Sequence, residues 1–330
     1  YYLRTRQADD KRRVRERLAA MAGCSADELV ITRNTTESLD TVIAGFDWRS
    51  GDEAVMAAQD YGAMLQMFAQ IERRHGITRR IVSLPLDPTD DDEVVRLYRD
   101  AITDRTRLVL VSHVVNLTGH VLPVAKICAV ARERGVPVLV DGAHAFAQLE
   151  FRVPELGCDY YGTSLHKWLG SPIGAGFLYV RRDRIRELWP LFGDDHPDDR
   201  IEKLNHTGTH PPHTDLAIEH ALRLHDEIGG ARKLERLRFL HRYWTEALRD
   251  EPRLVWFTPR QEQRTCAIAT VGVDGLAPAA LAKRLLDEHR IHTVAIDGAG
   301  VHGVRVTPQL YTTTDELDLL VAALRSICRS

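Results

Sequence analysis

Val136-Pro137-Val138-Leu139-Val140-Asp141-Gly142-Ala143-His144 is an apolar run that ends in a carboxylate, and about two dozen residues later the chain reads Ser164-Leu165-His166-Lys167-Trp168. A continuous apolar run is typical of a strand that is buried on both faces of a parallel sheet. Ligands of such sheets bind at the carboxyl ends of the strands. The two stretches therefore predict an α/β fold with Asp141 and Lys167 at one edge of its sheet.

A lysine and a strand-terminal acid in this order suit one cofactor, pyridoxal 5′-phosphate (PLP). The lysine amine forms a Schiff base with the cofactor aldehyde, and the carboxylate keeps the pyridine nitrogen protonated so that the ring withdraws electrons. Each residue alone has an ordinary alternative, because most lysines are solvated surface charges and an Asp after a strand is often a helix cap. The pair predicts a PLP site in which Lys167 and Asp141 are catalytic.

Composition narrows the class of protein. The 330 residues are 44% hydrophobic, which allows a large core in a main domain plus a smaller one. A formal net charge of −3 favours neither nucleic acid nor an anionic membrane as partner, and no apolar run approaches a membrane span. The five cysteines form no C-x-x-C pair, which indicates free thiols in a reducing compartment and predicts a cytoplasmic protein. Because the chain starts in helix-like sequence, we expect that a preceding segment, with any targeting signal, is missing.

Short apolar runs alternate with helix-like stretches through the first part of the chain, which predicts parallel strands with helices on both faces of the sheet. We predict a large domain over residues 1–205 and a smaller α+β domain over 206–330. The strands expected in the large domain are 28–32, 53–57, 80–84, 107–112, 136–140, 158–163 and 175–180, and the helices are 4–22, 35–46, 61–75, 90–101 and 123–134. In the smaller domain we expect helices at 214–228, 231–249, 278–289 and 314–328, and strands at 265–273 and 301–307.

Several polar residues follow these strands and are suited to binding phosphate. Thr35 and Thr36 open a helix, where backbone N–H groups and hydroxyls form a natural anion site. Ser164 and His166 flank Lys167 and offer further partners for phosphate oxygens. The alternative for the two threonines is an ordinary helix N-cap.

Three more residues are placed to contact the cofactor ring or the substrate. Tyr61 could stack on the ring or simply be half-buried at the end of a strand. Asn116 could bind the phenolic oxygen or a substrate carboxylate, although asparagine before glycine is common in turns. His144, three residues after Asp141, could reach the phenolic oxygen or stack beside the ring, and a purely structural role is equally open.

The ordered motifs Thr-Arg-Asn-Thr-Thr-Glu, Asp-Tyr-Gly-Ala, Asn-x-x-Gly, Val-Asp-Gly-Ala-His and Ser-x-His-Lys resemble the class V aminotransferases of PLP fold-type I. The isopenicillin N epimerase-like branch is the most similar, because Tyr61 stands where cysteine desulfurases usually carry a ring-stacking histidine. The resemblance implies a mainly parallel seven-stranded sheet in a three-layer large domain, a smaller C-terminal α+β domain, and a homodimer. The N-terminal arm of the family is apparently absent.

The resemblance also assigns two later segments. Asn205-His206-Thr207-Gly208-Thr209 is similar to a loop that reaches the partner subunit's phosphate in the dimer, which implicates Thr209. A metal site formed by His206, His210 and His213 is the rival interpretation, which we disfavour because two prolines break any helix that would align them.

Arg305, in His302-Gly303-Val304-Arg305-Val306-Thr307-Pro308, matches the arginine that binds the α-carboxylate of the substrate in the family. A guanidinium fits that task because its planar fork meets a carboxylate through two hydrogen bonds. The alternative is an exposed strand arginine.

The resemblance implies a PLP-dependent enzyme that acts at Cα of an α-amino acid, with Lys167 as Schiff-base lysine and general base. Aminotransferase or epimerase chemistry is expected, and β-elimination or C–S lysis is the alternative. Epimerisation needs a second proton donor, for which His120, His210 and Tyr61 are candidates.

Three further activities are disfavoured. Cysteine desulfuration needs a nucleophilic thiol, and no cysteine stands between Arg305 and Tyr311, while Cys266 lies in a run that predicts a buried strand. A non-catalytic PLP-fold binding protein would be expected to have lost Lys167. A nucleotide-binding enzyme would be expected to carry G-x-G-x-x-G or a P-loop, and the sequence has neither.

Overall fold

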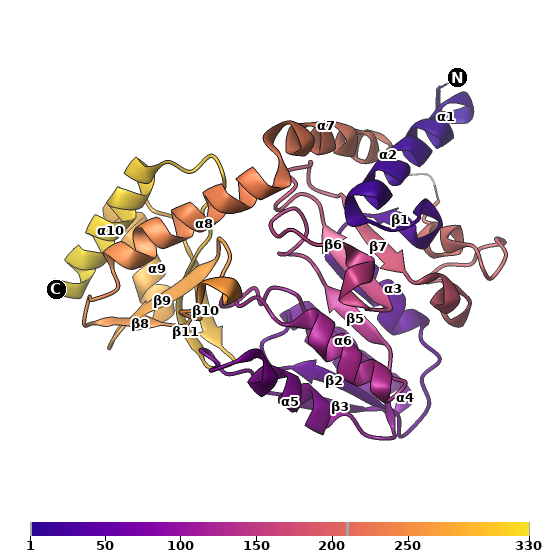
Figure 1. The fold of residues 1–330 in the computed structure, drawn as a ribbon, viewed down its shortest axis with the longest axis horizontal. Helices are drawn as coiled ribbons and strands as arrows, with labels where there is room; N and C mark the ends of the chain where they lie inside the picture. The colour runs from indigo at the N-terminus through magenta and orange to yellow at the C-terminus, as the bar shows by residue number, and fades with distance from the viewer. Residues whose placement is uncertain (1, 209–210, 330) are drawn as a thin grey trace.

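The computed structural model describes residues 2–208 and 211–329, which form a large α/β unit and a smaller α+β unit joined by two long helices (Figure 1). The large unit is built on a seven-stranded sheet of order β1-β7-β6-β5-β4-β2-β3. Six strands are parallel and β7 runs antiparallel to both of its neighbours, so the expectation of a mainly parallel seven-stranded sheet is confirmed. These strands are β1 (Leu29–Thr32), β2 (Glu53–Ala57), β3 (Thr78–Val82), β4 (Thr106–Ser112), β5 (Val138–Asp141), β6 (Tyr160–Ser164) and β7 (Gly176–Val180).

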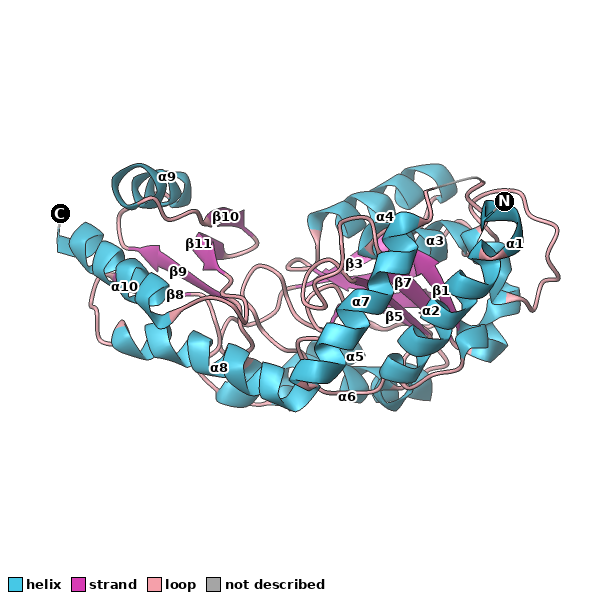
Figure 2. Ribbon diagram, turned by 90° about the horizontal axis from the view of Figure 1, so that it is seen from above, coloured by secondary structure: helices cyan, strands magenta, loops and turns pink. Residues whose placement is uncertain are grey.

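Helices cover both faces of this sheet, because its strands carry apolar side chains on both sides. Along β4, Val109 and Val111 pack into the core under α2, α5 and α6, whereas Leu108 and Leu110 pack into the core under α3 and α4. Figure 2 shows the sheet between these two layers. None of the described helices is both long and apolar enough to cross a membrane. The helices of this unit are α1 (Tyr2–Thr5), α2 (Gln7–Ala22), α3 (Thr35–Gly45), α4 (Gly62–His75), α5 (Asp91–Ala101) and α6 (Val124–Glu133), with 3₁₀ helices η1 (Ala26–Glu28), η2 (Val153–Leu156), η3 (Arg182–Glu187) and η4 (Ile201–Asn205).

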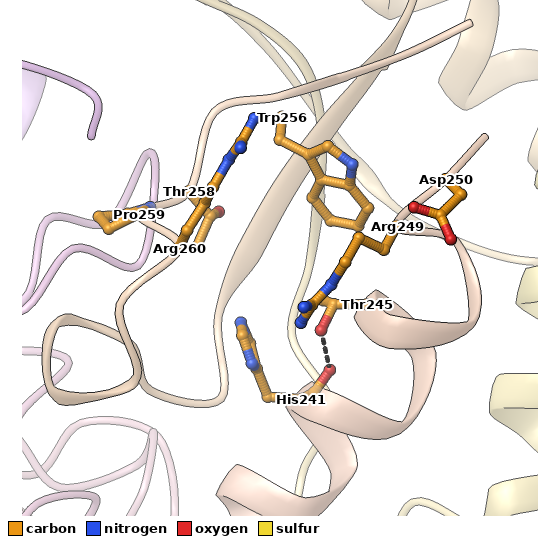
Figure 3. A pocket seen from close by; sticks show the side chains of 8 residues that line it. All are labelled: His241, Thr245, Arg249, Asp250, Trp256, Thr258, Pro259 and Arg260. Atoms are coloured by element: carbon orange, nitrogen blue, oxygen red, sulfur yellow. Dashed lines mark hydrogen bonds between the residues drawn. The ribbon is translucent and has the colours of Figure 1, made fainter. Parts of the chain in front are cut away.

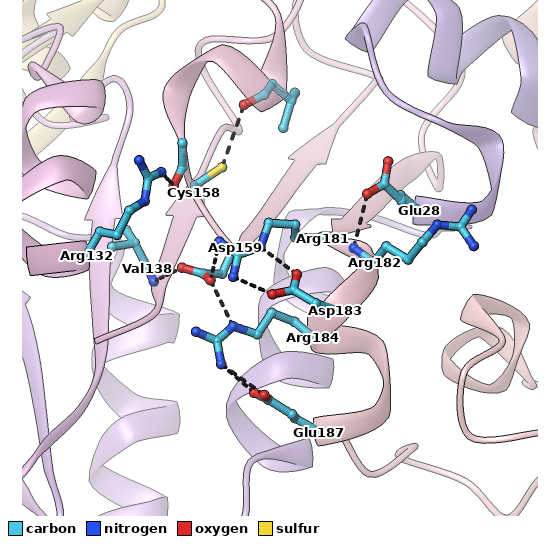
Figure 4. Close-up of polar contacts among 12 residues, drawn as sticks. Glu28, Arg132, Val138, Cys158, Asp159, Arg181, Arg182, Asp183, Arg184 and Glu187 are labelled. Carbon is cyan, nitrogen blue, oxygen red and sulfur yellow. Dashed lines mark hydrogen bonds and ion pairs between the residues drawn. The ribbon is translucent and has the colours of Figure 1, made fainter. Parts of the chain in front are cut away.

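The amino-terminal edge of the sheet is fixed by the buried carboxylate of Asp159, just before β6 (Figure 4). Its Oδ2 accepts a hydrogen bond of 2.8 Å from the backbone N–H of Val138, which ties the beginning of β6 to β5. Its Oδ1 lies 2.9 Å from Arg181 and 3.0 Å from Arg184, beyond the end of β7. One side chain thus holds three adjacent strands in register, and with them Asp141 and Ser164 at the opposite edge.

The smaller unit has a four-stranded antiparallel sheet of order β10-β11-β9-β8 packed against α8, α9 and α10. Two edge strands, β8 and β10, were not predicted, because β8 is very short and the residues of β10 are mostly exposed, so neither shows an apolar run. The strand expected at 265–273 begins only at Ala269; the residues before it are buried but irregular. The elements are β8 (Leu254–Trp256), β9 (Ala269–Val273), β10 (Val294–Gly298), β11 (Val301–Val306), η5 (Glu262–Arg264), α9 (Pro278–His289) and α10 (Thr314–Arg329).

Helices α7 (His213–Ile228) and α8 (Gly230–Ala247) connect the two units (Figure 1). Ile218 and Leu222 of α7 belong to the core of the large unit, and α7 lies along α2. The separate core of the smaller unit includes Leu240 of α8. Residues 213–228 therefore pack with the large unit. The sequence predicted that the large domain ends at residue 205, so this helix extends beyond the predicted boundary.

Candidate active site

A cavity of about 350 Å³ opens where the carboxyl ends of β1, β4, β5 and β6 meet. The structure brings together around it every described residue that the sequence assigned to catalysis, cofactor binding or substrate binding, whereas His120, one of the candidates for a second proton donor, does not line it. The assigned residues are Thr35, Thr36, Tyr61, Asn116, Asp141, His144, Ser164, His166, Lys167 and Arg305. Thr209, the remaining site residue, lies outside the described residues. The sequence gave no role to Asn34, Ser112, Val114 and Ala143, which also line the cavity.

Lys167 presents its amine to His144, with 3.1 Å between Nζ and Nε2. The indole N–H of Trp168 donates a hydrogen bond of 3.3 Å to Nδ1 of the same ring. Because indole can only donate, Nδ1 of His144 is the acceptor, and the neutral imidazole carries its proton on Nε2. That N–H then points at Lys167 Nζ, which can accept it only as the neutral amine.

The pKa values of both residues agree with this arrangement. Burial lowers the pKa of His144 well below its usual value, with Lys167 and Arg305 acting in the same direction. Burial also lowers the pKa of Lys167; Asp141 opposes this change and Arg305 adds to it. A neutral amine is the nucleophilic form of lysine, so the site favours covalent attachment to a carbonyl group.

Two buried carboxylates lie behind the cavity. Asp141, which ends β5, accepts a hydrogen bond of 2.9 Å at Oδ1 from the N–H of Ala143. Burial raises its pKa, whereas Ala143 and Lys167 lower it. Asp60 accepts hydrogen bonds from the N–H of Ala57 at 2.7 Å and from the hydroxyl of Ser112 at 2.7 Å, and burial raises its pKa to about 7. A cation facing Asp141 from the cavity would offset the cost of burying its charge.

A candidate anion site lies at the amino end of α3. Thr35 donates its backbone N–H to Ser164 Oγ at 2.9 Å, and the two hydroxyl oxygens are 2.7 Å apart. Asn34 caps the helix by accepting the N–H of Glu37 at 2.9 Å. The hydroxyls of Thr35, Thr36 and Ser164 therefore gather at the positive end of a helix dipole, where a phosphate is stabilised.

The close packing behind this anion site requires glycine at position 176. A Cβ there would lie 2.5 Å from the carbonyl oxygen of Thr163 and 2.8 Å from Cα of Asn34. Both contacts are with backbone atoms, which cannot move aside. Gly176 thus lets β7 pass directly behind the segment that opens α3.

Arg305 reaches the cavity from β11 of the smaller unit. It donates a hydrogen bond of 3.0 Å to the carbonyl oxygen of Asn116, and its Nε is buried without a partner. Burial lowers its pKa, and no carboxylate of residues 2–208 or 211–329 lies within ion-pairing distance of it. The amide oxygen of Asn116 is also buried without a partner. A half-buried cation without a counter-ion is suited to binding an anionic group of a ligand.

The three candidates for a second proton donor are placed differently. Tyr61 lines the cavity at the amino end of α4, and 45% of its surface is exposed. His120 does not line the cavity; it is buried, and its neighbouring charges are Arg264 and Asp91, away from Lys167. His210 lies outside the described residues. Tyr61 is therefore the candidate that the described part of the chain places at the site.

No cysteine lines the cavity, and all five cysteines are among the described residues. Cys266 is fully buried and its Sγ contacts the carbonyl oxygen of Gly119 at 3.4 Å. Burial raises the pKa of its thiol to about 12, which leaves it a poor nucleophile at neutral pH. The residues placed here thus offer no thiol beside Arg305.

Two supporting side chains were not predicted from the sequence. Gln309 donates a hydrogen bond of 3.3 Å to the carbonyl oxygen of Lys167 itself. Lys233 of α8, which is 3% exposed, donates to the carbonyl oxygen of Trp168. Both come from the chain beyond α7 and hold consecutive peptide groups of the lysine loop. No local pattern could have indicated them, because the partners are far apart in the sequence.

The histidines of the rival metal site do not form a cluster in the described residues. His206 Nδ1 lies 3.3 Å from Asp194 Oδ2, while His213 begins α7. A group of possible ligands within 4.8 Å of one another is formed by Asp194, Asp195 and His196 on a mostly exposed loop. Exposed acidic groups are common without an ion, so this group supports no metal assignment.

The aminotransferase class-V family matches residues 2–320. Isopenicillin N epimerase of Streptomyces clavuligerus is 30% identical over 331 residues, which cover 95% of this chain and 83% of that protein. Isopenicillin N epimerase of Amycolatopsis lactamdurans is 32% identical over 335 residues, with coverages of 96% and 84%.

Proteins with other names also match. A probable cysteine desulfurase of Pseudomonas aeruginosa is 35% identical over 189 residues, which cover 56% of this chain and 44% of that protein. Among solved structures, a mutant of C-DES with glycine covalently linked to its PLP cofactor has a TM-score of 0.88 at 26% identity, covering 96% of this chain and 86% of that one. A second C-DES structure, with a TM-score of 0.87 at the same identity and coverage, is described as a cystine C–S lyase with cysteine persulfide. The match over nearly the whole chain means that this protein belongs to the class V aminotransferase family.

Proposed function

We propose that this protein is a PLP-dependent enzyme that epimerises an α-amino acid at Cα, or transfers its amino group after the same initial loss of the Cα proton. The observation that carries the proposal is the placement of two groups in one cavity. Lys167 offers an amine whose pKa is lowered by burial, and Arg305 offers a cation that has no carboxylate within ion-pairing distance among the described residues. An amine for the carbonyl of a cofactor and a guanidinium for an α-carboxylate are the two contacts that amino-acid chemistry on PLP requires.

The residues present fit the cofactor. Asp141 is a buried carboxylate that a pyridinium nitrogen would neutralise, and Thr35, Thr36 and Ser164 form an anion site for its phosphate. Lys167 lies among them and is the residue for covalent attachment. When bound, PLP withdraws electrons from the attached amino acid and so makes its Cα–H bond acidic.

The proposed work of the protein groups follows from their contacts. Arg305 holds the α-carboxylate, while the carbonyl of Asn116 fixes the guanidinium. Lys167, once released, removes the Cα proton at Nζ, and His144 orients that amine because Trp168 sets its tautomer. For epimerisation a second group must return a proton to the other face of Cα, and we assign this role to the hydroxyl of Tyr61.

Epimerisation is supported by the two relatives of that name, which match over nearly the whole chain. The cavity lining contains no cysteine, which supports chemistry other than the formation of a persulfide on a cysteine of the enzyme. C–S lysis is the second candidate, because the likeness to the cystine C–S lyase C-DES covers 96% of this chain.

The test incubates the holoenzyme with single L- and D-amino acids in D₂O. Chiral chromatography measures stereochemistry, NMR measures deuterium at Cα, and product assays detect 2-oxo acid, ammonia and sulfide. We expect the opposite stereoisomer with deuterium at Cα, or a 2-oxo acid when an acceptor is supplied. Pyruvate and ammonia, together with sulfide from cysteine or with cysteine persulfide from cystine, would replace the proposal by C–S lysis. No exchange with any amino acid would overturn both.

We also propose that the protein works as a homodimer in which Gly208-Thr209 reaches the cofactor of the partner subunit. Complementation tests this arrangement. Lys167→Ala and Thr209→Ala each impair activity alone, but a mixed dimer contains one site with an intact Lys167 from one chain and an intact Thr209 from the other. Recovery of activity on mixing supports a shared site, and no recovery in a dimer that has demonstrably exchanged subunits contradicts it.

A further inference from the structure

A second cavity, of about 370 Å³, lies in the smaller unit between the last turns of α8 and the segment that follows β8 (Figure 3). None of its lining residues lines the candidate active site. Its volume is at the lower end of the range for sites that bind small molecules. Its lining combines a histidine, two arginines and a tryptophan, and these side chains indicate the kind of molecule that the cavity fits.

His241 is a buried polar group that points into this cavity. The residue is 7% exposed, and its Nε2 is buried without a hydrogen-bond partner. Figure 3 shows the imidazole rising from α8 into the space between Arg249 and Arg260. Burial lowers its pKa to about 4, so at neutral pH the ring is uncharged and offers one donor and one acceptor. A ligand that pairs with this ring would satisfy a buried polar group that is costly to leave without a hydrogen bond.

The two arginines beside the cavity have only loose partners. Arg249 lies 3.7 Å from Glu246, and Arg260 lies 3.8 Å from Asp87. Such exposed ion pairs contribute little to stability, so both guanidiniums are available to another anion. The planar fork of a guanidinium fits a carboxylate better than a spherical ion.

The aromatic wall of the cavity is Trp256, at the end of β8. Its indole packs against the buried Trp244, with 5.5 Å between ring centroids and 36° between planes, and the residue remains only half-buried. The side facing the cavity thus offers a supported aromatic surface to a planar apolar group.

We propose that this cavity is a binding site for a small aromatic monocarboxylate. The aromatic ring lies against Trp256, the carboxylate lies between Arg249 and Arg260, and the imidazole of His241 donates to it. Asp250, also on the lining, repels a second negative charge and so limits the ligand to one carboxylate.

A ligand in this cavity would lie beside β9, the strand that pairs with β11, which carries Arg305. Thr258, which lines the cavity, accepts the N–H of Thr270 at 2.8 Å and donates its hydroxyl to the carbonyl oxygen of Thr118 at 2.7 Å. Thr270 is the residue opposite Arg305 in the pairing of β9 with β11. Hydrogen bonds therefore connect the second cavity to β9, whose residue Thr270 pairs with Arg305 of the candidate active site.

The test is a calorimetric titration of the Arg305→Ala holoenzyme with phenylacetate, since Arg305 in the other cavity would itself attract a carboxylate. Phenylacetate should bind with a dissociation constant of about a millimolar, as expected for a ligand of its size. We expect one site per chain, with binding at least tenfold weaker for the uncharged analogue 2-phenylethanol. The imidazole ¹⁵N signals of His241 should shift on saturation.

Two variants assign the site. Arg249→Ala should weaken phenylacetate binding at least fivefold, and His241→Phe provides a second probe of the lining. Arg186→Ala is the matched control, because Arg186 is 71% exposed against 70% for Arg249 but lies on the large unit. No binding at 10 mM, equal binding of 2-phenylethanol, or equal losses with Arg249→Ala and Arg186→Ala would each overturn the proposal.

Discussion

Lys233→Met tests whether a charge buried beside the loop that carries Lys167 lowers the stability of the folded protein. Lys233 is 3% exposed, donates to the carbonyl oxygen of Trp168, and has no carboxylate within ion-pairing distance among the described residues. Burial lowers its pKa from 10.5 to about 8, so at pH 7 the folded protein keeps a charged amine in a site that disfavours charge. The wild-type protein should therefore gain stability as this amine loses its proton.

The magnitude follows from the change in pKa. A shift from 10.5 to about 8 corresponds to a penalty of about 3 kcal/mol at pH 7, at about 1.4 kcal/mol per pKa unit. The unfolded chain binds the proton more tightly, so the free energy of unfolding rises with pH between the two pKa values. Integrating this dependence over pH gives an increase in the free energy of unfolding of about 1 kcal/mol from pH 7 to pH 9 and of about 2.5 kcal/mol from pH 7 to pH 10. The neutral amine can still donate to Trp168, so this hydrogen bond survives the titration.

Methionine has a similar length and no charge, so Lys233→Met should lack this dependence on pH. The assay is urea unfolding of both holoenzymes at pH 7, 8, 9 and 10, and the quantity compared is the difference in free energy of unfolding. His225, whose pKa Lys233 helps to lower, titrates below this window. Lys283→Met is the control, because Asp287 raises the pKa of Lys283 above 10.5 and no rise is expected. A difference in free energy of unfolding between the wild type and Lys233→Met that stays constant from pH 7 to pH 10 would refute the buried-charge argument.

Three further substitutions address the candidate active site. Lys167→Ala should lower turnover at least a thousandfold and leave no cofactor attached after borohydride treatment, as read by mass spectrometry; attachment elsewhere would show that the lysine is misassigned. Arg305→Ala should raise KM roughly tenfold to a hundredfold through loss of a charged hydrogen bond, with the affinity for PLP within twofold, and equal losses of both would contradict its role. Trp168→Phe should lower kcat about threefold to tenfold with unchanged PLP affinity, because His144 can then adopt its other tautomer. An unchanged kcat and pH profile would contradict the proposal that Trp168 sets the tautomer of His144 and thereby orients Lys167.

The sequence predicted most of the central sheet well because its inner strands are buried on both faces and so appear as continuous apolar runs, whereas every residue of β3 at the edge is at least partly exposed. Asp141 and Ser164 could then be placed together, since the carboxyl ends of adjacent parallel strands meet at one edge. β10 could not be predicted in this way. Only Ile296 in its middle is buried, and its position depends on pairing with β11 rather than on a pattern of its own.

The supporting contacts of the site were not predictable for a different reason. Asp60 was visible as an acid after a strand, but its hydrogen bond to Ser112 depends on how β2 and β4 pair. Gln309 and Lys233 contact the lysine loop across 142 and 65 positions of sequence. Such contacts exist only once the smaller unit is packed against the large one, and a lysine in a helix reads as a solvated charge.

The division of the site between the two units bears on how one fold can serve several reactions. The large unit supplies the amine, the carboxylate and the anion site that any PLP chemistry needs, whereas Arg305 comes from β11 of the smaller unit. Its guanidinium contacts the large unit by donating a hydrogen bond to the carbonyl oxygen of Asn116. The neighbouring strand β9 also contacts the large unit, because the hydroxyl of Thr270 donates to the carbonyl oxygen of Leu117 at 2.6 Å. In the proposed reaction these contacts would fix the substrate carboxylate relative to Lys167, and that angle would select which bond at Cα is aligned for cleavage. A small change in this strand-to-loop contact could therefore redirect the reaction while leaving the cofactor site intact, which is consistent with epimerases and C–S lyases both resembling this chain.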